Sequence, residues 1–279
     1  MATSEKLINL GSKHEDVQNR PDDRNVAINE VGICDLKIPL VLKGCEKDQS
    51  VSQHVQAVFS LSVDLDGAKK GIHMSRLLET VLDHNKELSP NGLKNFLVDL
   101  SKRQLARNAY AKLDFDYFFT KVAPVSGIQS PQAYNCSFEC TSGPDGFKLK
   151  QSVEVPVKTL CPCSKEISDY GAHSQRSKVW ISIIQSDQAG SDTGLTLEEI
   201  VEVAENGASS PLYPILKRED ERHVTMSAYD KPCFVEDVVR NIAIVLDGDK
   251  RFDSYEIKVI NFESIHSHNA FAVIKKDNS

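Results

Sequence analysis

Apolar and polar residues alternate along several long segments of the chain, which is the pattern of half-buried β-strands. The clearest segment is 53–65, where Val55, Ala57, Phe59 and Leu61 recur at every second position. Turn-forming Gly, Pro and Ser residues separate such segments from one another. The same pattern predicts strands over 31–42, 111–122, 132–140, 147–157, 178–185, 254–262 and 270–274.

Between these strands, the apolar spacing changes to three and four residues, which is typical of amphipathic helices. In the segment 75–84, this spacing predicts that Leu78, Val81 and Leu82 share the buried face and that Ser75 is the N-cap. The same spacing predicts helices over 91–105, over 196–207, where Thr196 opens a capping box with Glu199, and over 234–246.

The order of these elements predicts the fold class. Strand pairs followed by helix pairs and further strand pairs indicate an α+β fold with mainly antiparallel sheets, built from two similar ββαα-like modules. We expect a single bimodular domain over 28–279, with module 1 at about 28–128 and module 2 at about 129–279. Residues 1–27 are polar and lack periodicity, so a mobile or extended N-terminal arm is predicted there. No glycine-rich phosphate loop follows a strand, which disfavours a Rossmann or P-loop protein.

Composition narrows the class further. The 279 residues are 40% hydrophobic and 26% charged, as in an ordinary globular protein. No apolar run approaches the roughly 18 residues that a membrane span needs, and the first residues lack a signal-peptide core, so a cytoplasmic protein without membrane contact is expected. The net charge of −7 does not favour a nucleic-acid partner. The seven cysteines are expected to be thiols rather than a disulfide framework.

The segment from Cys161 to His173 carries the strongest chemical signal. A thiolate and an imidazole are good ligands for Zn²⁺, and a site with few protein ligands leaves a position open for water. The spacing of Cys161 and Cys163 is not that of a zinc finger, so a structural four-cysteine site is disfavoured. Buried, inert cysteines are the alternative interpretation. Pro162 and Gly171 predict an irregular backbone that aims side chains into a cleft.

Three further polar clusters are candidates for a site. The charged run 216–223 is more typical of a solvated face. Glu236 and Asp237 lie in the first turn of a predicted helix, where carboxylates also suit the helix dipole. His266 and His268 lie between two predicted strands, in a pattern that favours acid–base or metal chemistry.

Four ordered motifs together resemble the prokaryotic type IB GTP cyclohydrolases, the second family of the first folate-pathway enzyme. The resemblance extends over roughly 25–273 and implies a tunnelling fold, in which subunits form a homotetramer with active sites at subunit interfaces. The motifs are Lys70-Gly-Ile-His-Met-Ser-Arg76, Val157-Lys-Thr-Leu-Cys-Pro-Cys-Ser-Lys165 with Gly171-Ala-His173, Phe234-Val-Glu-Asp237 and Glu263-Ser-Ile-His-Ser-His268.

The resemblance also implies a reaction. Members hydrolyse GTP to 7,8-dihydroneopterin triphosphate and formate with the help of a divalent metal ion, Zn²⁺ or Mn²⁺. It leaves open whether folate or queuosine synthesis takes the product. By the matching motifs, Cys161 and His173 are implied metal ligands, with Cys161 also catalytic, and Glu221 a carboxylate ligand. The acidic run lacks the proline that often precedes it in the family, so Glu219 remains an alternative to Glu221.

The remaining roles follow from the same resemblance. Glu236 is expected to accept hydrogen bonds from guanine, a bidentate role that suits a carboxylate. His266 and His268 are expected at the metal, with His266 preferred as ligand or proton carrier. The candidates for binding the triphosphate are Lys70, His73 and Arg76, for which an ordinary polar turn is the alternative.

Two other functions stay open on the sequence alone. One is a nitrile reductase of queuosine synthesis, which shares the tunnelling fold, a cysteine and a guanine-binding glutamate. It would consume reduced nicotinamide and release no formate. The other is a non-enzymatic assembly module stabilised by zinc, which would unfold when the metal is removed.

Overall fold

The computed structural model describes residues 16–85, 87–186 and 194–277, and these ranges contain nine strands. The strands are β1 (Ile28–Lys43), β2 (Ser52–Leu65), β3 (Ala109–Val122), β4 (Gln129–Gly143), β5 (Gly146–Leu160), β6 (Ser174–Ser186), β7 (Ser210–Pro211), β8 (Ser254–Asn261) and β9 (Ala270–Asp277). The helices are a short 3-10 helix η1 (Val17–Asn19), α1 (Met74–His84), α2 (Gly92–Gln104), α3 (Pro162–Ile167), α4 (Leu197–Gly207), α5 (Arg218–Asp230) and α6 (Val235–Asp247). None of the helices in the described ranges is long and apolar enough to cross a membrane.

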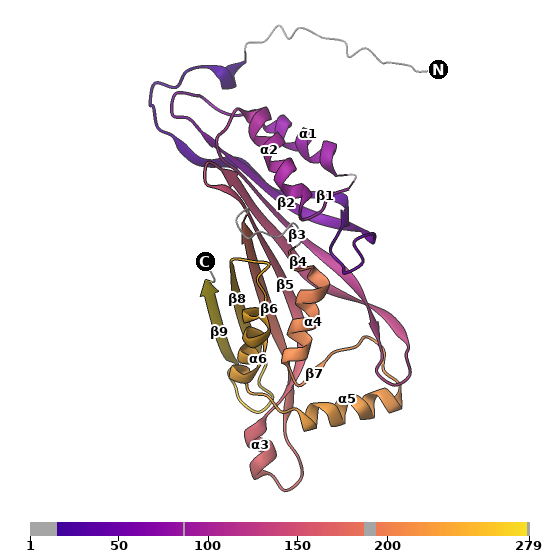
Figure 1. Cartoon of the computed structure of the whole chain (residues 1–279). Helices are drawn as coiled ribbons and strands as arrows, with labels where there is room; N and C mark the ends of the chain where they lie inside the picture. The colour runs from indigo at the N-terminus through magenta and orange to yellow at the C-terminus, as the bar shows by residue number, and fades with distance from the viewer. Residues whose placement is uncertain (1–15, 86, 187–193, 278–279) are drawn as a thin grey trace, which may run out of the picture.

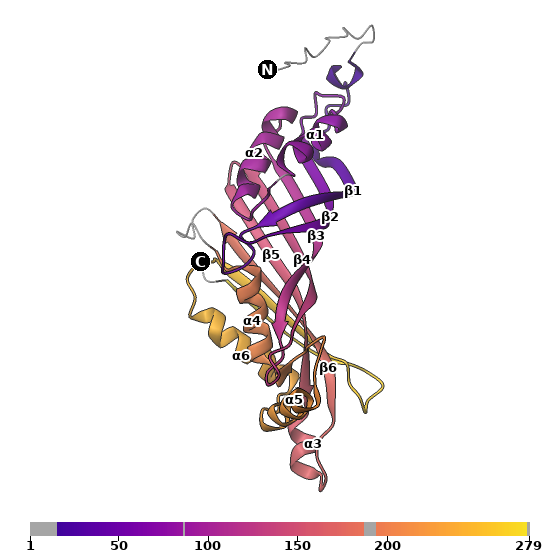
Figure 2. The same cartoon turned by 90° about the vertical axis from the view of Figure 1, so that its right-hand side faces the viewer.

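The strands form one long sheet in the order β1-β2-β3-β4-β5-β6-β8-β9, with β7 beside β5. All of these strand pairs are antiparallel, so the predicted α+β class with antiparallel pairing is confirmed. The molecule is elongated, with α1 and α2 near one end and α3 at the other (Figures 1 and 2). The predicted module boundary near residue 128 stays a prediction, because β4 pairs with both β3 and β5.

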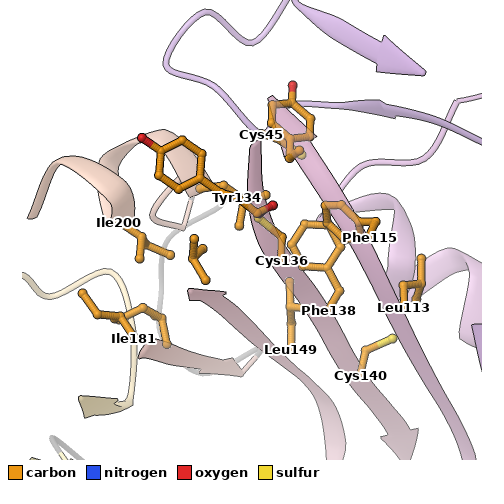
Figure 3. Packing of buried hydrophobic residues seen from close by; sticks show 14 of the residues in the cluster. Cys45, Leu113, Phe115, Tyr134, Cys136, Phe138, Cys140, Leu149, Ile181 and Ile200 are labelled. Carbon is orange, nitrogen blue, oxygen red and sulfur yellow. Dashed lines mark hydrogen bonds between the residues drawn. The ribbon is translucent and has the colours of Figure 1, made fainter. Parts of the chain in front are cut away.

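The core lies on one face of the sheet. Residues that face each other on adjacent strands share a face, and one such row is buried across six strands. Helix α2 packs on β3 and β4, α4 on β5, and α6 on β8 and β9. Phe115 and Phe138 lie side by side in this core, with ring centroids 5.1 Å apart (Figure 3). The buried row is Phe59, Leu113, Phe138, Gln151, Ile183 and Tyr255.

All seven cysteines are free thiols, as expected, and four of them are buried. Cys136 and Cys140 belong to the core (Figure 3). Burial raises the pKa of Cys45 and of Cys140 to about 12, which keeps both thiols protonated and unreactive. The inert interpretation therefore holds for these buried cysteines, whereas Cys161 is only half-buried and its role stays a prediction.

Helix α1 buries a different face from the one predicted. Leu78 and Leu82 are exposed, so their assignment to the core was wrong. The burial of Thr80 explains the error, because its hydroxyl donates to the backbone carbonyl of Arg76 at 2.7 Å and enters the interior with its hydrogen bond made. The predicted cap at Ser75 was also wrong, since this residue lies inside the helix. The buried residues of α1 are Leu77, Thr80 and Val81.

The segment 16–27 lies against the connection between β2 and α1. The backbone N–H of Asp22 donates to the carbonyl of Ala68 at 3.0 Å, and that of Lys70 donates to the carbonyl of Arg20 at 3.0 Å. This part of the predicted arm is therefore attached to its own chain. Residues 1–15 lie outside the described residues.

Candidate metal and substrate site

The hairpin formed by β5 and β6 brings Cys161 and His173 together. Cys161 follows the last residue of β5, His173 precedes the first residue of β6, and Leu160 pairs with Ser174. The backbone N–H of Cys161 donates to the carbonyl of His173 at 3.1 Å. Both side chains are half-buried. The thiol and the imidazole that the sequence singled out are thus held at the same end of one hairpin.

The predicted irregular backbone is confirmed for 168–173, where Gly171 has a φ of 147°, but it was wrong for the residues directly after Cys161, because the short helix α3 begins there. Cys161 is its N-cap, and its Sγ accepts a hydrogen bond from the backbone N–H of Ser164 at 3.4 Å. The hydroxyl of Ser164 donates to the carbonyl of Cys161 at 3.2 Å and accepts from the N–H of His173 at 3.1 Å. Sequence reasoning missed Ser164, because the short helix α3 that places it was not predicted.

The ring of His173 is oriented through Nδ1. This nitrogen lies 3.0 Å from Oε1 of Gln175 and 3.2 Å from Oγ of Ser264. Among the described residues, Nε2 has no hydrogen-bond partner, so it remains available as a ligand or proton acceptor. Ser264 lies in the β8–β9 loop, and its contact brings the start of that loop to His173.

The same loop carries His266 and His268, both exposed. Their rings stack with centroids 5.3 Å apart and planes 16° apart. The stacking places both rings on the same side of the loop. Which of the two acts at the metal stays a prediction.

Glu236 lies at the start of α6, close to the end of β5. The link is a backbone hydrogen bond of 3.0 Å from the N–H of Cys233 to the carbonyl of Leu160. The neighbouring carboxylate of Asp237 accepts from the N–H of Phe234 at 2.9 Å and so caps the helix. Glu236 is exposed and has no partner among the described residues. Of the two acids in this turn, Asp237 has the structural role and Glu236 is free to bind a ligand.

The acidic run forms the first turn of α5, a helix that the sequence analysis did not predict. Asp220, between the two candidate ligands Glu219 and Glu221, is fully buried. Its carboxylate accepts from the N–H of Val125 and of Ser126 at 2.8 Å each, from the hydroxyl of Ser126 at 2.6 Å, and from the N–H of Lys217 at 2.9 Å. Burial alone would raise the pKa of Asp220, but the hydrogen bonds outweigh it and hold this pKa well below its usual range.

Glu221 does not lie beside Cys161 within one chain. Helix α3 contacts the C-terminal end of α5, where Nζ of Lys165 donates to the carbonyl of Tyr229 at 2.6 Å. Glu221 is in the first turn of the same helix, about 12 Å away along its axis at the usual rise per residue. In the described ranges, no group of three or more His, Cys, Asp or Glu side chains could hold a metal ion. One chain therefore supplies Cys161 and His173 as neighbours but does not complete the predicted ligand set.

The predicted triphosphate residues lie at the other end of the molecule, around the start of α1, far from α3 (Figures 1 and 2). Each of them has a partner within the chain. The contact of His73 Nε2 with Asp16 has the distance of an ion pair but not hydrogen-bond geometry. The partners are Asp22 for Lys70, Asp16 for His73 and the backbone carbonyl of Arg103 for Arg76, at 3.5, 3.3 and 3.1 Å.

Comparison with solved structures defines the class of fold. A uricase from Arthrobacter globiformis has a TM-score of 0.53 and 8% identity, covering 89% of this chain and 93% of its own. A uricase from Bacillus fastidious has a TM-score of 0.52 and 8% identity, covering 90% and 93%. At such low identity, the likeness concerns the fold alone. The fold is the tunnelling fold, as the sequence resemblance implied.

Sequence comparison then defines the family. The family model described as type I GTP cyclohydrolase folE2 matches residues 14–272, and the chain belongs to this family. GTP cyclohydrolase FolE2 of Kosmotoga olearia is 42% identical, covering 95% of this chain and 99% of its own. The protein of the same name from Magnetococcus marinus is 43% identical, covering 93% and 95%, and that from Fervidobacterium nodosum is 39% identical, covering 94% and 97%.

Proposed function

We propose that the chain hydrolyses GTP to 7,8-dihydroneopterin triphosphate and formate, the first step of folate biosynthesis. The family match over residues 14–272 and the curated relatives named GTP cyclohydrolase FolE2 support the activity. The structural observation that carries it is the pairing of Cys161 with His173, beside the loop that bears His266 and His268. Whether queuosine synthesis also takes the product is a question of pathway, not of this site.

A divalent cation, Zn²⁺ or Mn²⁺, is held in this proposal by Cys161 and His173. The donor types fit Zn²⁺ well, because thiolate sulfur and imidazole nitrogen are among its preferred ligands. Such an ion acts as a Lewis acid and lowers the pKa of water in hydrolytic enzymes. Two protein ligands rarely suffice, so Glu221 or His266 is proposed to complete the set.

The separation of the candidate residues between the two ends of the molecule supports active sites at subunit interfaces. Lys70, His73 and Arg76 lie at the end opposite to α3 (Figure 1). If these cations bind the triphosphate of GTP, the base of the same GTP molecule must meet Cys161 of a different chain. We propose a homotetramer of this kind. Within it, we propose that each chain consists of two ββαα-like modules, divided near residue 128.

In the proposed reaction, different side chains bind the base and transfer protons. Glu236 accepts hydrogen bonds from the N1–H and the amino group of guanine, which selects this base. Opening of the imidazole ring requires a proton on the ring nitrogen, and His266 or His268 supplies it, because Cys161 at the metal is a deprotonated thiolate. The later ring closure needs further proton transfers and no redox cofactor. Free thiols at all seven cysteines suit a reducing compartment, so we propose that the protein acts in the cytoplasm.

The test is incubation of the full chain with GTP and Zn²⁺ or Mn²⁺, followed by measurement of formate and of pterin fluorescence after oxidation. Cys161→Ala is expected to abolish both signals, and Cys163→Ala is the matched control, because Cys163 is an exposed thiol in the same helix. Consumption of reduced nicotinamide without formate would instead identify a nitrile reductase. Loss of helical and strand signal in circular dichroism after chelation would identify a structural metal.

A further inference from the structure

A chain of buried polar side chains leads away from His173 into the sheet. Oε1 of Gln175 lies 3.0 Å from Nδ1 of His173, and Nε2 of Gln175 donates to Oγ1 of Thr159 at 3.1 Å. The hydroxyls of Thr159 and Ser177 are 2.8 Å apart, and Ser177 donates to Oδ1 of Asn261 at 2.7 Å. This row of hydrogen-bonded side chains crosses three neighbouring strands, β5, β6 and β8, and ends at Asn261, the last residue of β8.

The donor and the acceptor in each of these hydrogen bonds follow from the number of hydrogens that each group carries. A hydroxyl has one hydrogen to donate. Ser177 donates its hydrogen to Asn261, so it must accept from Thr159. Thr159 has then used its hydrogen and must accept from the amide N–H of Gln175, which turns the amide oxygen toward His173. An amide oxygen only accepts, so Nδ1 of His173 carries the proton.

The reverse arrangement would have the opposite result at the ring. If Asn261 presented its amide nitrogen to Ser177, each hydroxyl would donate the other way and the nitrogen of Gln175 would face His173. Nδ1 would then be an acceptor and Nε2 would carry the proton. A protonated Nε2 cannot bind a metal ion or accept a proton. The two arrangements exclude each other, and the orientation of one remote amide selects between them.

Burial of these side chains ensures that their hydrogen bonds, and not water, decide which tautomer of His173 is present. Thr159 and Ser177 are fully buried, Asn261 is 3% exposed and Gln175 is 9% exposed, so water does not replace the missing partners easily. The backbone pairs Thr159 with Gln175 and Ser177 with Asn261, which fixes the spacing of the side chains. Ser264, the other contact of Nδ1, can donate or accept and does not oppose either arrangement.

We propose that Gln175, Thr159, Ser177 and Asn261 are positioning residues that hold His173 in the tautomer with the proton on Nδ1 and the lone pair on Nε2. The importance of this tautomer for a metal site depends on the proposed function, but the tautomer itself does not. Hydrogen bonding of the second ring nitrogen to an oxygen is how metal-binding histidines are usually oriented.

The first experiment measures the tautomer directly. The full-length, metal-free protein is labelled with ¹⁵N-histidine, and the ring nitrogens of His173 are identified by comparison with His173→Gln in magic-angle-spinning NMR. The wild type is expected to show a protonated Nδ1 and an unprotonated Nε2. Thr159→Val and Ser177→Ala, which interrupt the chain, are expected to show a mixture of both tautomers. Thr159→Ser, which keeps the hydroxyl, is expected to restore the wild-type spectrum.

A matched control comes from the same two strands. Ser152 of β5 and Ser182 of β6 form a hydroxyl pair at 2.7 Å that has no connection to His173. Ser152→Ala therefore removes a hydrogen bond of the same kind without affecting the ring. Its His173 spectrum is expected to match that of the wild type.

The second experiment measures Zn²⁺ affinity by competition with a chelator. Thr159→Val is expected to weaken binding by roughly 10- to 100-fold, the usual effect of losing such a supporting partner, whereas Ser152→Ala keeps the wild-type affinity. A wild-type His173 with its proton on Nε2, or an unchanged tautomer in both interrupting variants, would overturn the proposal. A correct tautomer without conversion of GTP would contradict only the proposed activity.

Discussion

The carboxylate of Asp220 accepts a hydrogen bond from the hydroxyl of Ser126 at 2.6 Å, and this contact attaches α5 to the β3–β4 loop. The two residues are 94 positions apart in the chain. Because Glu219 and Glu221 flank Asp220, the same contact fixes the direction in which the candidate metal ligands leave the helix.

Replacing Asp220 with Asn is expected to destabilise the fold. The variant keeps the shape of the side chain but loses the charge that the donors from Ser126, Val125 and Lys217 stabilise. The midpoint of thermal unfolding at neutral pH should fall by roughly 5 °C or more. Glu219→Gln is the control, because this exposed residue makes no such contacts, and an equal effect in both variants would refute the assignment.

The pH dependence of stability should change in the same variant. The pKa of Asp220 is lower in the folded chain than the ordinary value of 3.8. Its contribution is therefore fully present above about pH 4 and is lost as the pH falls toward the folded-state pKa. Urea unfolding at neutral pH and at acidic pH should show a smaller acid-induced loss of stability in Asp220→Asn than in the wild type.

Cys161→Ala and His173→Ala are each expected to lose bound metal and activity while keeping the fold. The two side chains lie at the end of a hairpin whose core packs elsewhere, so removing them leaves the packing intact. Metal content by elemental analysis, together with circular dichroism, checks this expectation. Full metal content and full turnover in either variant would remove the basis of the proposed site.

Glu236→Gln is expected to weaken GTP binding by about 2 kcal/mol or more, because an amide reverses half of the hydrogen-bonding pattern toward guanine. Calorimetric titration with GTP measures the change. Asp237→Asn alters the charge one residue further along but affects a helix cap, so it should lower stability and leave GTP affinity unchanged. Equal affinities for Glu236→Gln and the wild type would exclude this guanine contact.

His266→Ala is expected to reduce activity by at least roughly 10²-fold, the usual scale for a lost general acid or base, and His268→Ala is expected to cost less. The stacked rings offer both imidazoles to the same space, but only the nearer one can transfer a proton at about 3 Å. Single-turnover formate release at matched metal occupancy measures both variants. A larger loss in His268→Ala would exchange the two roles.

Much of the fold could be predicted, because local patterns carry it. Thr196 shows this well: its hydroxyl accepts from the N–H of Glu199, and the Glu199 carboxylate accepts from the N–H of Thr196, as the capping box predicted. The strands were found by their period of two, although most extend beyond the predicted ends because backbone pairing continues where side chains no longer alternate. Helices α3 and α5 were missed because neither has an apolar stripe that the sequence reveals.

The site was only partly predictable. Cys161 and His173 were found because their side chains have distinctive chemistry. Thr159 and Ser177 were missed, since a hydroxyl in a strand looks ordinary. A signal did exist, however: both occupy positions at which the alternation of β5 and β6 calls for an apolar residue. Contacts between distant segments, such as that of Asp220 with Ser126, leave no such local trace.

Cys161 lies next to α3 and Lys70 just before α1, and these two helices are at opposite ends of the molecule (Figure 1), so under the proposed function each reaction needs two chains. Under the proposed function, an active site exists only where the ends of two chains meet. The specific activity therefore falls when the protein is diluted below the dissociation constant of the assembly. Mixtures become informative for the same reason. Chains disabled at Cys161 and chains disabled at Lys70 are each inactive, but together they form some sites from two intact ends, and the mixture regains activity that neither variant has alone.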